Sequence, residues 1–272
     1  MRVEKFKDDM TSEVVEFNSL SEFYKYLDET PFNKAFKEES HSSVTGDMSF
    51  TKTNSFEEAI DLFKYGWVDM SAKLTQKLKV ADKNLQGVMK QRTTLGVQGY
   101  QAVVPLYLNG CPNNMVTKKM VCMKQKVITL NKSICYSAGY SPREIEEESI
   151  KAMQIIKRLE SQGYRCNLNV VLGVYKGTKR IVVKVRVKNS NEKLNVSKLA
   201  FPLVHPSMLR RLFFRFIEVY PGVTKPYTRG YGIPVRAHVI ERYVDDNEFV
   251  IPEKINVDVN KIKSLDDLKV MF

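Results

Sequence analysis

The chain has 272 residues, 43% of them hydrophobic, so it can bury the core of one large domain or of two small ones. No apolar run approaches the roughly 20 residues needed to span a membrane, and no secretory signal follows Met1. The cysteines lack metal-ligand spacing, which argues against a structural zinc site and predicts buried free thiols in a reducing cytosol. They are Cys111, Cys122, Cys135 and Cys166.

The net charge of +12 is unevenly distributed along the chain. Residues 1–60 hold 7 Lys and Arg against 13 Asp and Glu, a charge of −6, and residues 61–272 carry the balancing +18. Such an excess favours a polyanionic partner, because each phosphate that the protein neutralises releases counterions. The alternative is a Lys-rich protein without such a partner.

The first 66 residues predict an acidic and mainly helical region. Ser19 and Ser55 each precede a glutamate by three residues, which is the pattern of a capping box, and the helices that they open end near Thr30 and Gly66. Residues 71–92 then predict a basic amphipathic helix. Residues 97–108 predict a strand, which Pro105 restricts to an edge or a bulge.

The central unit, residues 126–188, predicts a strand over 127–136, a long helix and two further strands over 166–176 and 180–188. The helix start is marked by a capping box between Ser141 and Glu144, with proline at the first helical position. Its apolar side chains recur at helical spacing and should lie against a sheet. They are Ile145, Ile150, Met153, Ile156 and Leu159.

The last strand of this unit alternates cations with Ile and Val, so one face is apolar and the other carries Arg180, Lys184, Arg186 and Lys188 around Val182. We expect the apolar face to pack on the long helix and the cationic face to point at water or at a partner. A basic sheet face can follow a phosphate backbone, but it also serves simply to keep a protein in solution. If the cations point outward, replacing them with glutamine should leave the fold intact.

A second basic patch is predicted on a helix capped by His205, where Arg210, Arg211 and Arg215 lie on or beside the polar face. Arginines suit phosphate contact, although they are also common on solvated helix faces. The following loop alternates aromatic and basic residues, Tyr227, Arg229 and Tyr231, and predicts either a stacking surface or a loop packed by its own tyrosines.

Signals for an enzyme are poor, because the motifs of nucleotide-binding loops, serine hydrolases and zinc proteases are absent. His238, Glu241, Asp245 and Asp246 suggest a hard-metal site for a nuclease. However, residues 235–243 predict a strand, on which His238 and Glu241 would point to opposite faces. We therefore assign no catalytic residue, no metal ligand and no cofactor.

Three stretches together resemble an uncharacterised family of bacteriophage and mobile-element proteins. They are Gly66-Trp67, the run 104–115 containing LNGCPNNM, and the run 200–214 containing FPLVHPSMLRRLFF. The resemblance covers about residues 18–220 and implies a phage-encoded protein acting in the host cytoplasm or in the virion. It implies no catalytic residues.

The sequence therefore predicts an α+β protein with a mixed or antiparallel sheet and helices on one face. Its β-α-β-β-α unit is analogous to half of a ferredoxin-like sandwich. We expect an acidic helical region over 1–66, a core domain over 67–244 and a polar tail over 245–272. The leading function is a non-enzymatic nucleic-acid-binding accessory protein in replication, transcription or genome packaging. The alternative is a virion structural or assembly protein whose basic face meets DNA or an acidic partner, and a metal-dependent nuclease comes third.

The predicted packing of the long helix is tested by Ile156→Asp. An unpaired carboxylate buried against the sheet should unfold the domain, because its cost of several kcal/mol is comparable with a total stability of about 5–15 kcal/mol. Thermal melting of the purified variant checks this, and a cooperative transition at the wild-type midpoint would contradict the packing.

Overall fold

The computed structural model describes residues 1–7, 11–33, 42, 48–81, 90–121, 126–176, 179–221, 223, 233–262, 265 and 267–268. A seven-stranded mixed sheet forms its main body, in the order β1-β2-β8-β7-β6-β10, and β9 pairs with β7. Its strands are β1 (Arg2–Lys7), β2 (Thr11–Phe17), β6 (Val127–Ser133), β7 (Arg165–Lys176), β8 (Lys179–Lys188), β9 (Ile233–Pro234) and β10 (Glu248–Ile251). The sheet confirms the α+β class, and it draws strands from each of the three regions that the sequence pattern separates.

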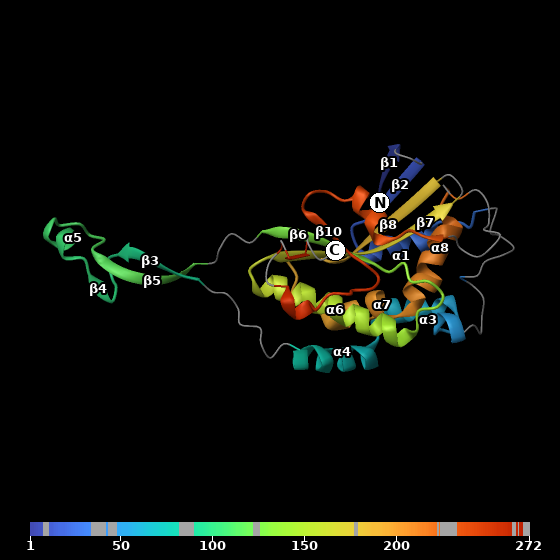
Figure 1. Cartoon of the computed structure of the whole chain (residues 1–272), viewed down its shortest axis with the longest axis horizontal. Coiled ribbons are helices and arrows are strands. Elements are labelled where there is room, and N and C mark those ends of the chain that lie inside the picture. Colours follow the sequence, from blue (N-terminus) through green and yellow to red (C-terminus); the bar gives the residue numbers. More distant parts are fainter. Residues whose placement is uncertain are drawn as a thin grey trace.

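The helices lie mainly on one face of this sheet (Figure 1). They are α1 (Leu20–Glu29), α2 (Met48–Thr51), α3 (Phe56–Tyr65), α4 (Val68–Ala81), α6 (Pro142–Ser161), α7 (Val196–Val204), the π-helix η4 (Met208–Phe213) and α8 (Phe214–Val219). Three short helices complete the body, namely α9 (Ala237–Ile240), η5 (Glu241–Tyr243) and η6 (Val259–Lys261).

The central unit has the predicted order of elements, and the helix start has the predicted chemistry. Both hydrogen bonds of the capping box between Ser141 and Glu144 are present at the start of α6. Strands β6 and β7 are parallel and directly paired, with α6 as the crossover. The unit is thus an unsplit β-α-β followed by a hairpin, whereas a ferredoxin-like half is a split β-α-β.

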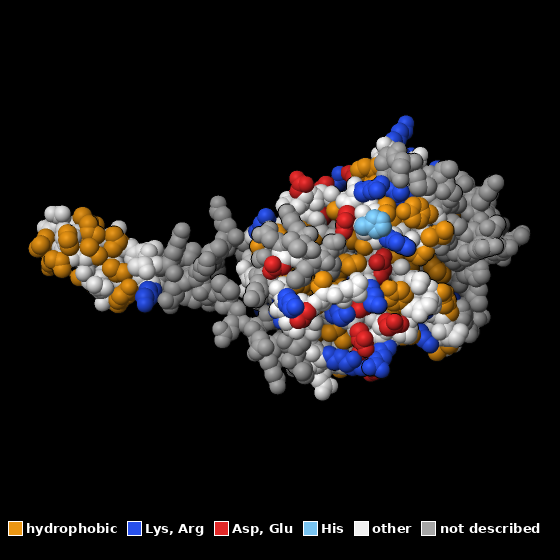
Figure 2. Space-filling view, viewed as in Figure 1, with side chains coloured by type: hydrophobic (Ala, Val, Ile, Leu, Met, Phe, Trp, Pro, Cys, Tyr) orange, Lys and Arg blue, Asp and Glu red, His pale blue; other side chains and the backbone are white. Residues whose placement is uncertain are grey.

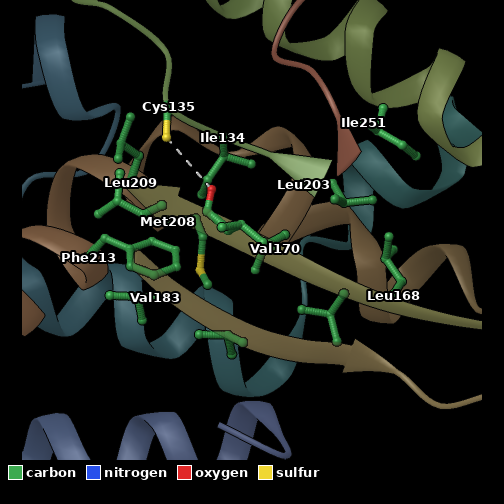
Figure 3. Close-up of a cluster of buried hydrophobic side chains, with 14 of the residues drawn as sticks. Ile134, Cys135, Leu168, Val170, Val183, Leu203, Met208, Leu209, Phe213 and Ile251 are labelled. Atoms are coloured by element: carbon green, nitrogen blue, oxygen red, sulfur yellow. Dashed lines mark hydrogen bonds between the residues drawn. The ribbon is translucent and has the colours of Figure 1, made fainter. Parts of the chain in front are cut away.

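The main core lies between the sheet and the helices. Val170 and Val183 lie near Met208 and Phe213 of η4, and Leu168 lies farther along β7 on the side of Ile251 and Leu203 (Figure 3). Four of the five predicted core residues of α6 are buried, and Ile150 is partly buried. The apolar face of β8 packs on α7 and α1, while α6 packs on β7.

Two predicted strands are helices in the structure. Residues 104–108 form α5 (Val104–Leu108), because Pro105 fits the first turn of a helix, where its missing N–H costs nothing. Residues 237–243 form α9 and η5. The helical backbone changes the prediction for His238 and Glu241. Residues three apart on a helix lie on the same side, whereas on a strand they would point to opposite faces.

A second, three-stranded sheet lies apart from the main body (Figure 1). It consists of β3 (Lys90–Gly96), β4 (Gln101–Ala102) and β5 (Met115–Val121), with α5 between β4 and β5. We call residues 90–121 the small sheet. No described side chain from 93 to 118 is buried, so this sheet has no core of its own.

Gly173 in β7 marks the closest approach between the main sheet and the segment that follows β9. A Cβ atom added there would lie 2.6 Å from Cβ of Val235, whose N–H donates to the Gly173 carbonyl at 2.8 Å. We expect Gly173→Ala to lower the free energy of unfolding by about 1–3 kcal/mol through overpacking. Gly139→Ala, where the nearest atom would be 3.9 Å away, is the matched control. Urea unfolding checks both, and equal midpoints would contradict the expected clash.

Candidate functional site

The cations predicted to form an exposed face on β8 are largely buried, so the predicted outward orientation is wrong. Arg180 and Lys188 are each 2% exposed and Lys184 is 5% exposed. The face that carries Arg180 and Lys184 is covered by chain from distant parts of the sequence, whereas a register shift between β7 and β8 places Lys188 opposite Leu168, on the face that the helices cover. Arg180 donates to the Tyr243 hydroxyl of η5, and Lys188 donates to Glu160 of α6 at 2.7 Å.

Lys184 and Arg186 belong to a polar network that crosses five strands. Lys184 Nζ lies 3.0 Å from Glu16 of β2 and 3.2 Å from Glu248 of β10. The network continues through amides: Arg186 Nε donates to Asn169 of β7 at 2.6 Å, and Asn169 donates to Asn131 of β6 at 2.7 Å. Asn131 in turn donates to Glu248 at 3.1 Å, which closes the chain of contacts. Burial lowers the pKa of Arg186 despite the two nearby carboxylates.

The second predicted patch is also buried, because the arginines of η4 and α8 bind Ser42 and residues 50–53. Arg211 is fully buried and donates to the carbonyls of Ser42 and Thr53, both at 2.9 Å. Arg210 is 4% exposed and donates to the Phe50 carbonyl at 2.6 Å. Arg215 stacks over the rings of Phe32 and Phe56. These side chains hold the protein together, so we propose no nucleic-acid contact through them.

The third predicted group, Tyr227, Arg229 and Tyr231, lies outside the described residues. Two of the cysteines, Cys135 and Cys166, are buried free thiols as predicted, while Cys111 is partly exposed. Burial raises the pKa of each buried thiol to about 12, so neither is suited to act as a nucleophile.

A groove of about 640 Å³ with a mixed polar and apolar lining lies where β6 and β10 end. His238 and Glu241 both line it, because they lie three residues apart on helical backbone, and Tyr140, Arg236 and Glu253 also contribute. Asp245 and Asp246 are not among its described lining residues. Within the described part of the chain, no group of three His, Cys, Asp or Glu side chains is placed to hold a metal ion. The groove therefore carries no assigned chemistry.

Figure 2 shows hydrophobic side chains gathered on the surface of the small sheet. We call four of them the apolar tip: Tyr100, Val104, Tyr107 and Leu108, which are 60–76% exposed. Leu95 and Val97 lie beside them and are 51% and 71% exposed. Sequence reading missed this surface, because residues 97–108 were expected to form a strand at a sheet edge or a bulge.

The tip is held in one shape by its own backbone. The Val103 N–H donates to the Asn114 carbonyl at 2.7 Å, and the Cys111 N–H donates to the Leu106 carbonyl at 2.9 Å. Gly99 passes so close to β5 that an added Cβ would lie 2.1 Å from the Val116 carbonyl oxygen. Such a fixed arrangement loses little conformational freedom when it binds a partner.

All the charged side chains of the small sheet are basic. Residues 90–121 include four Lys and Arg and no Asp or Glu. Lys118 is exposed, with its Nζ 5.1 Å from the centroid of the Tyr100 ring. An acid-free run of this kind is readable in the sequence, and it is the signal that could have pointed to this region.

The buried network changes what is expected of the triple variant Lys184→Gln, Arg186→Gln and Lys188→Gln. Removing the cations takes a lysine partner away from each of Glu16, Glu160 and Glu248, and breaking one buried ion pair typically costs about 3–5 kcal/mol. We expect the variant to unfold or to melt far below wild type. The control is Lys5→Gln with Lys25→Gln, whose side chains are 72% and 70% exposed. Chemical denaturation compares them, and a triple variant as stable as this control would contradict the network.

Comparisons with known proteins identify the family of this chain. Neither the curated proteins nor the solved structures give a match. No helix in the described residues is both long and apolar enough to cross a membrane. One family model, described as a domain of unknown function, matches residues 7–269. Because this match covers nearly the whole chain, the protein belongs to the DUF7192 family.

Proposed function

We propose that this protein is a non-enzymatic binding and assembly protein, and that the small sheet is the part that contacts a partner protein. The observation that carries the proposal is the apolar tip, which is more than half exposed on a sheet without a core. Contiguous exposed apolar surface of this kind marks sites of protein interaction in folded proteins. The phage or virion context implied by the resemblance stays a prediction.

The composition of the tip favours a protein partner over a nucleic acid. Its side chains are two aliphatic residues and two tyrosines, and the neighbouring Leu95 and Val97 extend the aliphatic surface. Aliphatic side chains gain most from packing into an apolar pocket, whereas nucleic acids are held by stacking and by cations. Tyrosine is also among the residues enriched at the centres of protein interfaces.

A nucleic-acid-binding accessory role is the second candidate, and one observation favours it. The small sheet combines an exposed lysine against an exposed tyrosine with the complete absence of acidic residues. Aromatic rings beside cations can stack unpaired bases while the cations contact phosphates. This candidate requires no contact by the buried cations of β8 or η4.

Photocrosslinking in the source cells tests the proposal. A photoreactive phenylalanine replaces Tyr107 in the tip or, as the matched control, Ile233, which is 71% exposed on the main body. We expect a protein adduct from position 107 and little from position 233. Adding Leu108→Asp should reduce the adduct by roughly tenfold or more, because a carboxylate is costly to bury in an apolar contact.

The outcomes separate the candidates. A nuclease-sensitive adduct at position 107 would replace the proposed function with the nucleic-acid role. Equal yields at both positions, or a yield that Leu108→Asp leaves unchanged, would overturn the proposal. Circular dichroism melting of each variant confirms that the altered side chains, which are exposed, leave the fold intact.

A further inference from the structure

A second groove, of about 510 Å³, lies on the main body between the first turns of α4 and α6. We call it the α4–α6 groove. The connection between α7 and η4 forms a further side, and Lys52, which follows α2, also lines it. Figure 2 shows basic side chains gathered on the part of the body where Figure 1 places α4. The volume lies within the range of sites for small organic molecules, about 300–1,000 Å³.

The α4–α6 groove has an excess of positive charge. Its lining includes four cations and two carboxylates, namely Lys52, Lys73, Lys77, Arg143, Glu146 and Glu147. Lys73 and Lys77 both donate to Glu146, at 2.8 Å and 2.5 Å. Burial favours the neutral form of Glu146, but the two lysines outweigh it and hold its pKa below the ordinary value. Arg143 pairs with Glu147 at 3.0 Å, so two positive charges remain in excess.

Lys52 supplies a cation that no described residue pairs with. Its φ of +65° lies in the left-handed region, which glycine adopts far more readily than lysine. The Thr51 hydroxyl donates to the Thr53 carbonyl at 2.8 Å and fixes the turn around it. Backbone strain of this kind is concentrated at binding sites. The turn therefore places an unpaired ammonium group at the groove.

Two residues that line the groove have ring N–H groups without an acceptor. His205 is 5% exposed, and its Nδ1 accepts from the Ser207 N–H at 3.1 Å, so the proton of the neutral ring lies on Nε2. Burial lowers the pKa of His205 to about 4, which keeps the ring neutral at pH 7. Within the described residues, neither this N–H nor the Nε1–H of Trp67 donates to a protein atom. Because buried donors normally have a partner, these two point to a ligand.

The aromatic wall of the groove is held in place by ring contacts. The Trp67 ring packs edge-to-face on His205 with centroids 4.7 Å apart, and His205 stacks on Phe201 at 5.2 Å. Met70 and Pro142 extend the apolar lining. A fixed wall of this kind suits a flat aromatic ring.

We infer that the α4–α6 groove binds an aromatic phosphate ester of about the size of a nucleoside monophosphate. A phosphate ester carries a charge of about −1.5 to −2 at pH 7, which matches the excess of positive charge, and lysine is a common phosphate ligand. The aromatic ring of the ligand would pack against Trp67. The groove lies on the main body, so this inference does not rest on the function proposed for the small sheet.

Tryptophan fluorescence tests the inference, because Trp67 is the only tryptophan in the chain and reports on this groove alone. The full chain is titrated with each of the ribonucleoside 5′-monophosphates, and isothermal titration calorimetry gives an affinity that does not depend on the fluorescence. We expect binding of at least one monophosphate. The matching nucleoside lacks the phosphate and ribose 5-phosphate lacks the ring, so each should bind about tenfold more weakly or worse.

Lys52→Gln removes the unpaired cation and should weaken monophosphate binding by about tenfold, the usual loss for one hydrogen bond to a charged group. The matched control is Lys25→Gln on α1, whose side chain is 70% exposed and lies outside the groove. Circular dichroism melting checks that both variants are folded. Arg143→Gln, at a side chain that is 88% exposed, replaces Lys52→Gln if that variant does not fold.

Three results would each overturn the inference. The first is the absence of calorimetric heat with every monophosphate at millimolar concentration. The second is equal affinity for the monophosphate and for its nucleoside or ribose 5-phosphate. The third is a folded groove variant that binds as tightly as the Lys25→Gln control.

Discussion

The main sheet depends on neutralising the cations of its own central strand. Lys184 lies between a carboxylate from β2 and one from β10, which belong to opposite ends of the chain. Burying a charged side chain costs several kcal/mol unless a partner of opposite charge and hydrogen bonds compensate it. The seven-stranded sheet supplies both, because its strand order brings acids and amides from β2, β10, β7 and β6 onto the same face. The position of each strand is thereby tied to that of the others.

The sequence correctly predicted the elements whose signals lie within a few neighbouring residues. The capping box at Ser141 and the apolar stripe of α6 can both be read from residues three or four apart, and both are present. The alternation on β8 correctly separated an apolar from a cationic face as far as Arg186, but a register shift against β7 then turns Lys188 to the helix side. It could not say which faces are covered, because the covering groups, Glu16, Tyr243 and Glu248, lie more than fifty residues away in sequence. Arg211 was misplaced for the same reason, since its carbonyl acceptors at Ser42 and Thr53 are distant in sequence.

The exposed surface of the small sheet was missed for a different reason. Its strands and turns satisfy their own hydrogen bonds, so apart from the acid-free run nothing in the local pattern distinguishes them from strands of a larger core. Only the structure shows that no second layer from the described residues covers them, and that Tyr107 and Leu108 are exposed. Apolar residues that the body does not use are free to serve a contact elsewhere. In this protein the buried charged residues hold the fold together, and the exposed apolar residues of the small sheet are available for binding.

The position of β2 affects the order in which the chain can fold during synthesis. β2 pairs in parallel with β8, so residues 11–17 acquire their main partner only after residues 179–188 have left the ribosome. β10 completes the far edge later still. Pairings over such sequence separations are slow, because the closure of a long loop precedes any gain from contact. The amino-terminal hairpin must therefore wait without its sheet partner, and until β8 is available only α1, which packs on Phe17, can shield part of its apolar surface.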